Sequence, residues 1–245
     1  MKNATITSQQ KSARIAGLIF LFIVIGWILN WTLIDSKLIV TGDVTKTINN
    51  IIANELLFRV SLTFELIFAI CSLLLAFALF IILKPINKNI SFLALNLKLV
   101  ESIIAVVIVL ITFITLQMLN GKAYLTIFKP EQMQDVIGLF INIRSSCSTI
   151  SMVFLGLNFI VFFYLLFKSK YVPGVLSIFG IISYLLILVY SLISMIIPQD
   201  VIVNTISMIF FMPSIIFEIT IGLWLLIKGV NIKTEDETEL KSDRT

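Results

Sequence analysis

The stretch RVSLTFELIFAICSLLLAFALFIIL, residues 59–83, decides the class of fold. After Glu65 it contains no charged residue, and Lys84 follows it directly. About 20 predominantly apolar residues in an α-helix are enough to cross the hydrocarbon core of a bilayer. The length and composition of this stretch therefore predict a membrane-spanning helix.

The same pattern recurs along the chain, and it predicts spans at 15–34, 59–83, 91–118, 145–167, 174–197 and 206–228. The 245 residues are 59% hydrophobic and 13% charged, whereas a soluble domain has about 45–50% apolar and about 25% charged residues. We therefore predict an all-α, polytopic membrane protein, a bundle of six transmembrane helices whose main partner is the lipid bilayer. The first apolar run is too long for a signal peptide and lacks a cleavage site, so we expect it to be retained.

The distribution of basic residues between the connecting loops predicts the orientation of the chain in the membrane. With both termini in the cytoplasm, eleven basic residues lie inside, six lie outside and Lys98 lies within the third span. We expect a cytoplasmic N-terminal tail at 1–14, a membrane domain at 15–230 and a disordered cytoplasmic tail at 231–245. The outside set is Lys37, Lys46, Arg59, Lys122, Lys129 and Arg144.

Two outside connections have helical character, and they are expected to form amphipathic segments on the outer face. Asp43 is a candidate cap for a helix with apolar residues at helical spacing through Leu56. Pro130 is a candidate first residue of another, with Glu131 in the position favoured by the helix dipole. The alternative is that these segments are early starts of the second and fourth spans.

Charged residues within the spans are the candidate functional groups, because a charge at mid-membrane costs about 2.5–3.5 kcal/mol even on insertion scales. Lys98, Asn158 and Glu218 each lie ten residues from a lysine at the cytoplasmic end of their span. A rise of about 1.5 Å per residue places all three near mid-membrane. Glu101 shares a helix face with Lys98. We predict a central polar cluster of Lys98, Glu101, Asn158 and Glu218, and no catalytic residue.

A second charged group is expected nearer the outside, formed by Arg59, Glu65 and Arg144. Arg144, Ser148 and Asn158 fall on one polar stripe of the fourth span. Such stripes face partner helices or a wet cavity and not lipid.

Several classes of function are disfavoured by composition. Histidine is absent, which removes the usual general base and the commonest metal ligand. Cys71 and Cys147 form no CxxC motif, and no hydrolase, metalloprotease or nucleotide-binding motif occurs. No Lys/Arg cluster resembles a nucleic-acid-binding face. We expect no cofactor, no metal and no nucleic acid; protein partners are not indicated.

Seven segments carry a resemblance to a known family: KSARIAGLIF (11–20), TGD (41–43), ELLFR (55–59), LKPINK (83–88), LKLVES (97–102), FLGLNFIVFFYLLFKSKYVP (154–173) and FEITIGLWLLIKGVN (217–231). Together they resemble a bacterial multi-pass family called domain of unknown function 4386. The resemblance implies a six-helix bacterial membrane protein with no established activity. We expect the protein to lie in the bacterial cytoplasmic membrane.

The resemblance also bears on single residues. It implies a basic residue at Lys98, often a carboxylate at Glu101, a carboxylate at Glu218 and a match at Arg59. The family often has histidine where this chain has Asn158, a departure that weakens a metal or proton-relay role here.

Three hypotheses of function remain. The first is non-enzymatic binding or transport of a small polar solute or ion at the central polar cluster. The second is a scaffold or assembly protein whose buried charges are structural ion pairs. The third is a membrane-embedded enzyme, for which no nucleophile and base are visible in the sequence.

Overall fold

The computed structural model describes residues 2–40, 42–120, 130–197 and 204–232, among which there is no strand. Six of the described helices are long and apolar enough to cross a membrane, which confirms the predicted number and class. The elements in chain order are α1 (Lys2–Asn30), the π-helical turn η1 (Trp31–Asp35), α2 (Ser36–Leu38), α3 (Val44–Ala53), α4 (Glu55–Leu83), α5 (Lys88–Asn120), α7 (Pro130–Ser169), α8 (Gly174–Ile196) and α9 (Asn204–Ile227).

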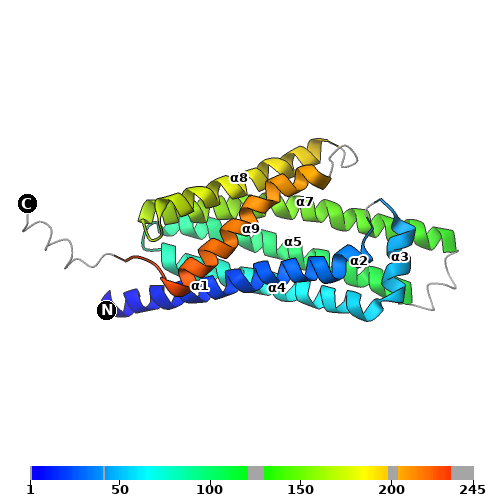
Figure 1. Cartoon of the computed structure of the whole chain (residues 1–245), viewed down its shortest axis with the longest axis horizontal. Helices are drawn as coiled ribbons and strands as arrows, with labels where there is room; N and C mark the ends of the chain where they lie inside the picture. Colours follow the sequence, from blue (N-terminus) through cyan, green and yellow to red (C-terminus); the bar gives the residue numbers. More distant parts are fainter. Residues whose placement is uncertain (1, 41, 121–129, 198–203, 233–245) are drawn as a thin grey trace, which may run out of the picture.

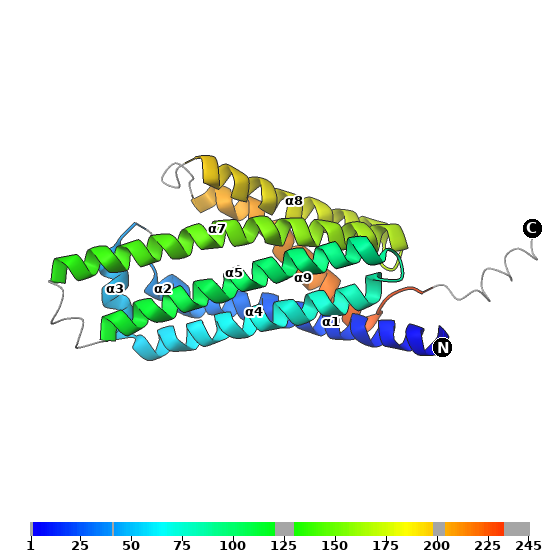
Figure 2. The ribbon, with the colours of Figure 1, turned by 180° about the vertical axis from the view of Figure 1, so that it is seen from behind.

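The long helices form a ring in which neighbours in the chain are neighbours in space. α1 packs on α4, α4 on α5, α5 on α7, α7 on α8 and α8 on α9, and α9 returns to pack against α1 (Figures 1 and 2). The start of α1 and the end of α9 lie at the same end of the bundle (Figure 1). We call this the proximal end, and the end that carries α3 the distal end.

Close packing between α1 and α9 depends on glycine. A Cβ at Gly17 would collide with the backbone of Leu226 and Gly222, so only glycine permits this approach. The bundle buries large apolar side chains such as Phe162 and Leu79, while many others remain exposed on its outer surface. An apolar exterior is what a bundle surrounded by lipid requires.

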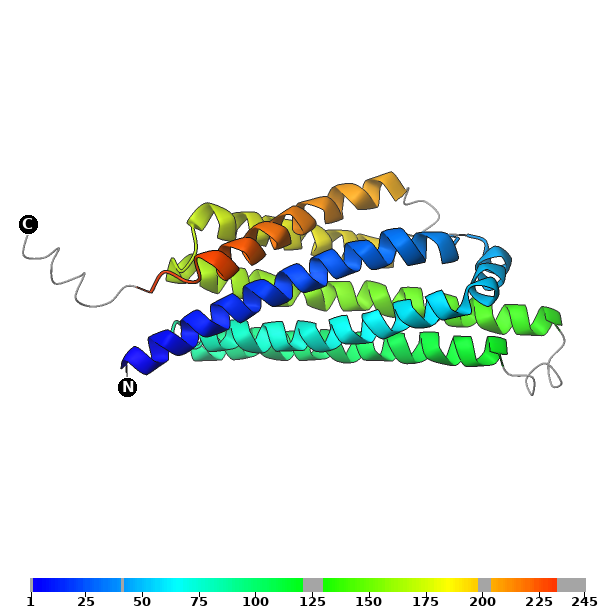
Figure 3. The same ribbon diagram turned by 60° about the horizontal axis from the view of Figure 1, so that its bottom comes forward.

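The two predicted amphipathic segments have different outcomes. The first is a separate helix, α3, which lies across the distal end (Figure 3). The Asp43 side chain accepts a hydrogen bond of 2.8 Å from the Lys46 backbone N–H, as predicted for a cap. The second begins at Pro130 but continues into the fourth span as one helix, α7. There the alternative, an early start of the fourth span, is what the structure shows.

At the proximal end, helix replaces part of the predicted tail. α1 begins at Lys2, so most of the segment 1–14 extends the first span. The Gln10 side chain donates to the Val230 carbonyl at 2.5 Å and accepts from the Val230 N–H at 3.2 Å. These bonds tie the start of the chain to the segment after α9. Most of the predicted disordered tail, 233–245, lies outside the described residues, as do Lys122 and Lys129.

Candidate functional site: two buried charged clusters

Lys98 and Glu101 form an ion pair on α5, within the central cluster. Lys98 Nζ lies 2.6 Å from Glu101 Oε2, and Lys98 is only 1% exposed. The three-residue spacing places both side chains on one helix face. Their contact lacks hydrogen-bond geometry, and neither of these two atoms has a hydrogen-bond partner among the described residues.

Glu218, on α9, is bound by a residue that the sequence analysis did not single out. The hydroxyl of Tyr184, on α8, donates a hydrogen bond to Glu218 Oε1. Tyr184 is fully buried, and its ring contacts that of Phe159 on α7 with centroids 4.5 Å apart. Lys98 lies within electrostatic range of Glu218, and Glu101 within range of Tyr184. The central cluster thus gathers charges from α5 and α9 around a tyrosine of α8.

Asn158, on α7, is buried, and only the nitrogen of its side-chain amide is hydrogen-bonded. Its Nδ2 donates to the Phe154 carbonyl, one turn earlier on the same helix, at 2.7 Å. Its Oδ1 has no hydrogen-bond partner among the described residues, and the same holds for the buried hydroxyl of Ser102 on α5. Each of these two oxygen atoms can therefore still accept a hydrogen bond in the interior of the bundle.

Aromatic rings pack beside Lys98. The Lys98 ammonium lies 5.1 Å from the centroid of the Phe159 ring, in cation–π range. Phe163 stacks on Phe159 and meets Phe217 edge to face, with centroids 5.4 and 4.6 Å apart. Lys98 is therefore covered by a ring, whereas 12% of the Glu101 side chain remains exposed.

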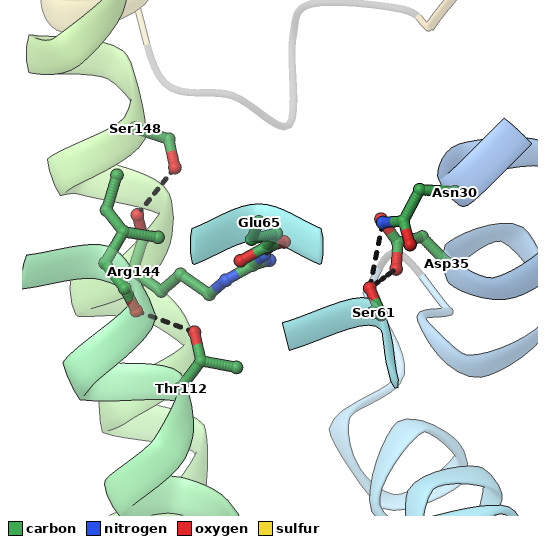
Figure 4. A network of polar contacts seen from close by, with 8 residues as sticks. Asn30, Asp35, Ser61, Glu65, Thr112, Arg144 and Ser148 are labelled. Carbon is green, nitrogen blue, oxygen red and sulfur yellow. Dashed lines mark hydrogen bonds and ion pairs between the residues drawn. The ribbon is translucent and has the colours of Figure 1, made fainter. Parts of the chain in front are cut away.

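A second set of polar groups, buried or half-buried, lies between the end of α1 with η1, α4 and α7; Figure 4 shows its side chains. We call it the distal cluster; its members are Asn30, Asp35, Ser61, Glu65 and Arg144. Arg144 reaches from α7 to α4, where its Nη2 donates to Glu65 Oε1. The two side chains are 28% and 22% exposed, more than the central pair. This predicted contact joins helices that are far apart in the sequence.

The other half of the distal cluster is centred on Asp35, in the π-helical turn. Ser61 Oγ donates to Asp35 Oδ1 at 2.8 Å, and Asn30 Nδ2 donates to Asp35 Oδ2 at 3.2 Å (Figure 4). Asn30 Nδ2 also donates to Ser61 Oγ at 2.9 Å. Asp35 lies within electrostatic range of both Arg144 and Glu65. The carboxylate of Asp35 therefore belongs to the same cluster as the ion pair.

Comparison with known protein families identifies the family to which the chain belongs. A family model described as Domain of unknown function (DUF4386) matches residues 15–229. The chain belongs to this family. No curated protein and no solved structure matches it. All members of both clusters lie within the matched range of this DUF4386 protein.

One predicted grouping in the DUF4386 protein differs from the structure. Arg59 does not join Glu65 and Arg144, because its Nε pairs with Glu55 Oε1, 2.6 Å away and one turn earlier on α4. The Arg59 and Glu55 side chains are 41% and 39% exposed. This surface pair is separate from the distal cluster.

Sequence reasoning missed four residues of the two clusters: Asn30, Asp35 and Ser61 in the distal cluster, and Tyr184 in the central region. The predicted first span ended at residue 34, whereas the helical segment continues through η1 to Leu38 and includes Asp35. For Tyr184 the available signal was its position on one helical face with Ser177, Gly180 and Ser191, all of which are buried.

Two cavities in the DUF4386 protein lie away from the central cluster. The larger, about 530 Å³, is between α7 and α8 and is lined by hydroxyl and amide side chains that include Asn142, Thr149 and Ser194. The other, about 300 Å³, lies on α4 beside Arg59 and Phe64. Neither is lined by a residue of the central cluster.

Proposed function

We propose that this DUF4386 protein binds a small polar solute or ion at the central cluster. In this proposal the protein lies in the cytoplasmic membrane of a bacterium, with both termini in the cytoplasm. The excess of basic residues at the proximal end supports the orientation. The family resemblance supports the bacterial location.

The observation that carries the proposal is a pair of unpartnered oxygens, one on Asn158 of the central cluster and one on Ser102, the residue after Glu101. Asn158 Oδ1 and Ser102 Oγ are buried without a partner among the described residues, and an unpaired buried polar group costs about 1–3 kcal/mol. The cluster also contains two carboxylates, Glu101 and Glu218, for one ammonium, Lys98. A bound solute or ion would supply the missing partners and balance the charge.

Each residue has a distinct role in such a site. Lys98 supplies positive charge, and the two glutamates accept a cation or protons. Asn158 orients the bound species through its carbonyl oxygen, which has no other partner among the described residues. Tyr184 holds Glu218 in place through its hydroxyl.

Glu218→Gln tests the proposal, because a glutamine oxygen can still accept the Tyr184 hydroxyl while the charge is lost. The purified protein is unfolded thermally in detergent in the presence of small amino acids, quaternary amines and alkali-metal chlorides. We expect at least one probe to raise the Tm of the unmodified protein and not that of Glu218→Gln. Glu55→Gln is the matched control, because Glu55 belongs to the exposed pair with Arg59. A panel without any such difference contradicts binding at this cluster.

A scaffold function is the second candidate, and a specific observation favours it. The Lys98–Glu101 ion pair and the Tyr184–Glu218 hydrogen bond satisfy several of the charges internally, under aromatic rings. A purely structural role predicts that Glu218→Gln and Lys98→Met lose stability equally and that the double variant recovers it. Cross-linking that captures one stoichiometric partner would favour the same alternative.

A further inference from the structure

The larger cavity of the DUF4386 protein lies where α7 and α8 separate. The two helices approach closely at Gly156, where an added Cβ would lie 2.9 Å from Leu188 Cβ. From there they diverge toward the distal end (Figure 2). The cavity, about 530 Å³, lies between the diverging segments, next to Thr149 of α7 and Ser194 of α8. This volume is typical of small-molecule sites, which measure about 300–1,000 Å³.

Polar side chains from both helices line this α7–α8 cavity. Asn142, Ser146 and Thr149 come from α7, and their spacings of four and three residues place them on one helix face. Ser194 comes from α8. Among the described residues that line the cavity, none is acidic or basic. The lining is therefore polar and uncharged.

The hydroxyl groups of this lining present acceptors to the cavity. Each donates its hydrogen to the backbone carbonyl four residues earlier on its own helix, at 3.0 Å for Ser146, 3.2 Å for Thr149 and 2.9 Å for Ser194. A hydroxyl has one hydrogen and two lone pairs, so the three oxygens can still accept. The side-chain amide of Asn142 can both donate and accept. A ligand rich in O–H groups matches this lining.

The cavity lies at the level of lipid headgroups. Thr149 and Asn142 lie 19 and 26 residues from Lys168, near the proximal end of α7, which corresponds to about 28 and about 39 Å. A hydrocarbon core of about 30 Å measured from Lys168 therefore ends between them. The exposed apolar side chains of Ile150 and Ile196 border the same cavity. A lipid can thus place its headgroup in the cavity and its acyl chains against these two side chains.

We propose that the α7–α8 cavity binds the uncharged, polyhydroxylated headgroup of a glycolipid. Sugar hydroxyls donate to the oxygens of Ser146, Thr149 and Ser194 and accept from the amide of Asn142. An anionic headgroup would find no basic side chain, and an amine no carboxylate, among the lining residues that the structure describes. The cavity shares no residue with the central cluster, so this inference is independent of the proposed function.

The test is thermal unfolding of the full-length protein in octaethylene glycol dodecyl ether, a detergent without a sugar that could compete. The probe is dioctanoyl glucosylglycerol, compared with dioctanoylglycerol and dioctanoyl phosphatidylglycerol. We expect the glucosyl lipid to raise Tm by about 5 °C or more at concentrations near 100-fold above Kd. The two lipids without a sugar should give no such rise. Methyl glucoside raising Tm as much as the glucosyl lipid would contradict a lipid ligand and assign the cavity to a free sugar.

Variants of the lining sharpen the result. Thr149→Val combined with Ser194→Ala removes two acceptors, and it should weaken the apparent affinity for the glucosyl lipid at least about tenfold. The variant should fold, because hydroxyl bonds to the preceding helical turn do not stabilise a helix. Thr220→Val is the matched control and should respond like the unmodified protein. Thr220 donates to the Ile216 carbonyl at 2.7 Å in the same way, but it lies on α9 and does not line the cavity.

Two further outcomes would overturn the proposal. One is a rise in Tm with dioctanoylglycerol or the phosphatidylglycerol that equals the rise with the glucosyl lipid. The other is an equal response to the glucosyl lipid in the unmodified protein and in the double variant. Glu218→Gln should retain the response, which separates a failure at this cavity from a failure of binding at the central cluster.

Discussion

The central and distal clusters have the same charge composition in different surroundings. Each contains one basic side chain and two carboxylates. In the central cluster the ion pair is local, between residues three apart on α5, and its side chains are 1% and 12% exposed. In the distal cluster the ion pair connects α4 and α7, and about a quarter of each side chain is exposed. The members are Lys98, Glu101 and Glu218 in the first, and Arg144, Glu65 and Asp35 in the second.

From this difference we expect burial, more than charge composition, to set the energetic consequence of losing one partner of each ion pair. Removing one partner of a fully buried pair leaves an uncompensated charge in a low dielectric. Removing one partner of a partly exposed pair leaves a charge that water and salt can screen. The following variants test the comparison, from the largest expected effect to the smallest.

Lys98→Met should have the largest effect, because it leaves the half-buried Glu101 and Glu218 without a base in the interior of the bundle. The expected loss in free energy of unfolding is about 3–5 kcal/mol. Reversible unfolding by SDS in mixed micelles measures it. Adding Glu101→Gln in the same chain should recover much of the loss. A loss below that of Arg144→Met would reverse the ranking of the two clusters.

Tyr184→Phe removes the hydroxyl that donates to Glu218 and keeps the ring that packs on Phe159. A hydrogen bond to a charged group contributes about 1.5–3 kcal/mol, so a loss in this range is expected in the same unfolding measurement. In Glu218→Gln the further loss from Tyr184→Phe should be smaller, because the acceptor is then neutral. Equal losses in the two backgrounds would contradict a charge-assisted bond.

Arg144→Met should cost about 1–2 kcal/mol at low ionic strength, since Glu65 keeps partial access to water. The loss should shrink when unfolding is repeated at high salt, because screening weakens exposed ion pairs. The effect of Lys98→Met should change little under the same conditions. Identical salt dependence for the two variants would argue against different exposure of the clusters.

Arg59→Gln should have the smallest effect, below about 0.5 kcal/mol, because the pair with Glu55 is exposed and one turn apart on one helix. Sequence reasoning grouped Arg59 with Glu65 and Arg144. An effect as large as that of Arg144→Met would restore that grouping.

Hydropathy alone was sufficient for the architecture. The six apolar segments and the cap at Asp43 are visible in the sequence, because lipid requires long apolar helices and caps use local spacing. The charged part of the central cluster was also predictable. Lys98 and Glu218 lie at equal distances from lysines that end their spans, and a regular helical rise converts these distances into depth. Asn158 lies at the same distance along its span, but its hydrogen bond among the described residues is to Phe154, so its place in the cluster stays a prediction.

There is a separate physical reason why sequence reasoning misplaced or overlooked each of the remaining residues. The π-helical turn extends the first span past its apolar stretch and so includes Asp35 among the buried charges. Arg59 pairs with Glu55, four residues earlier on α4, because this spacing places both side chains on one helix face, whereas Glu65 is six residues further on and lies on another face. A tyrosine within an apolar span, such as Tyr184, does not stand out in the sequence. Its importance follows from the packing of α8 against α7 and α9.

The sequence by itself determined the number of spans, their apolar exteriors and the presence of charges that must avoid lipid. These properties depend on composition and on spacing within single helices. The tertiary structure decided which charges meet, how far each is exposed and which atoms remain without a partner. Those outcomes depend on helix rotation and on packing between distant segments, which local spacing does not specify.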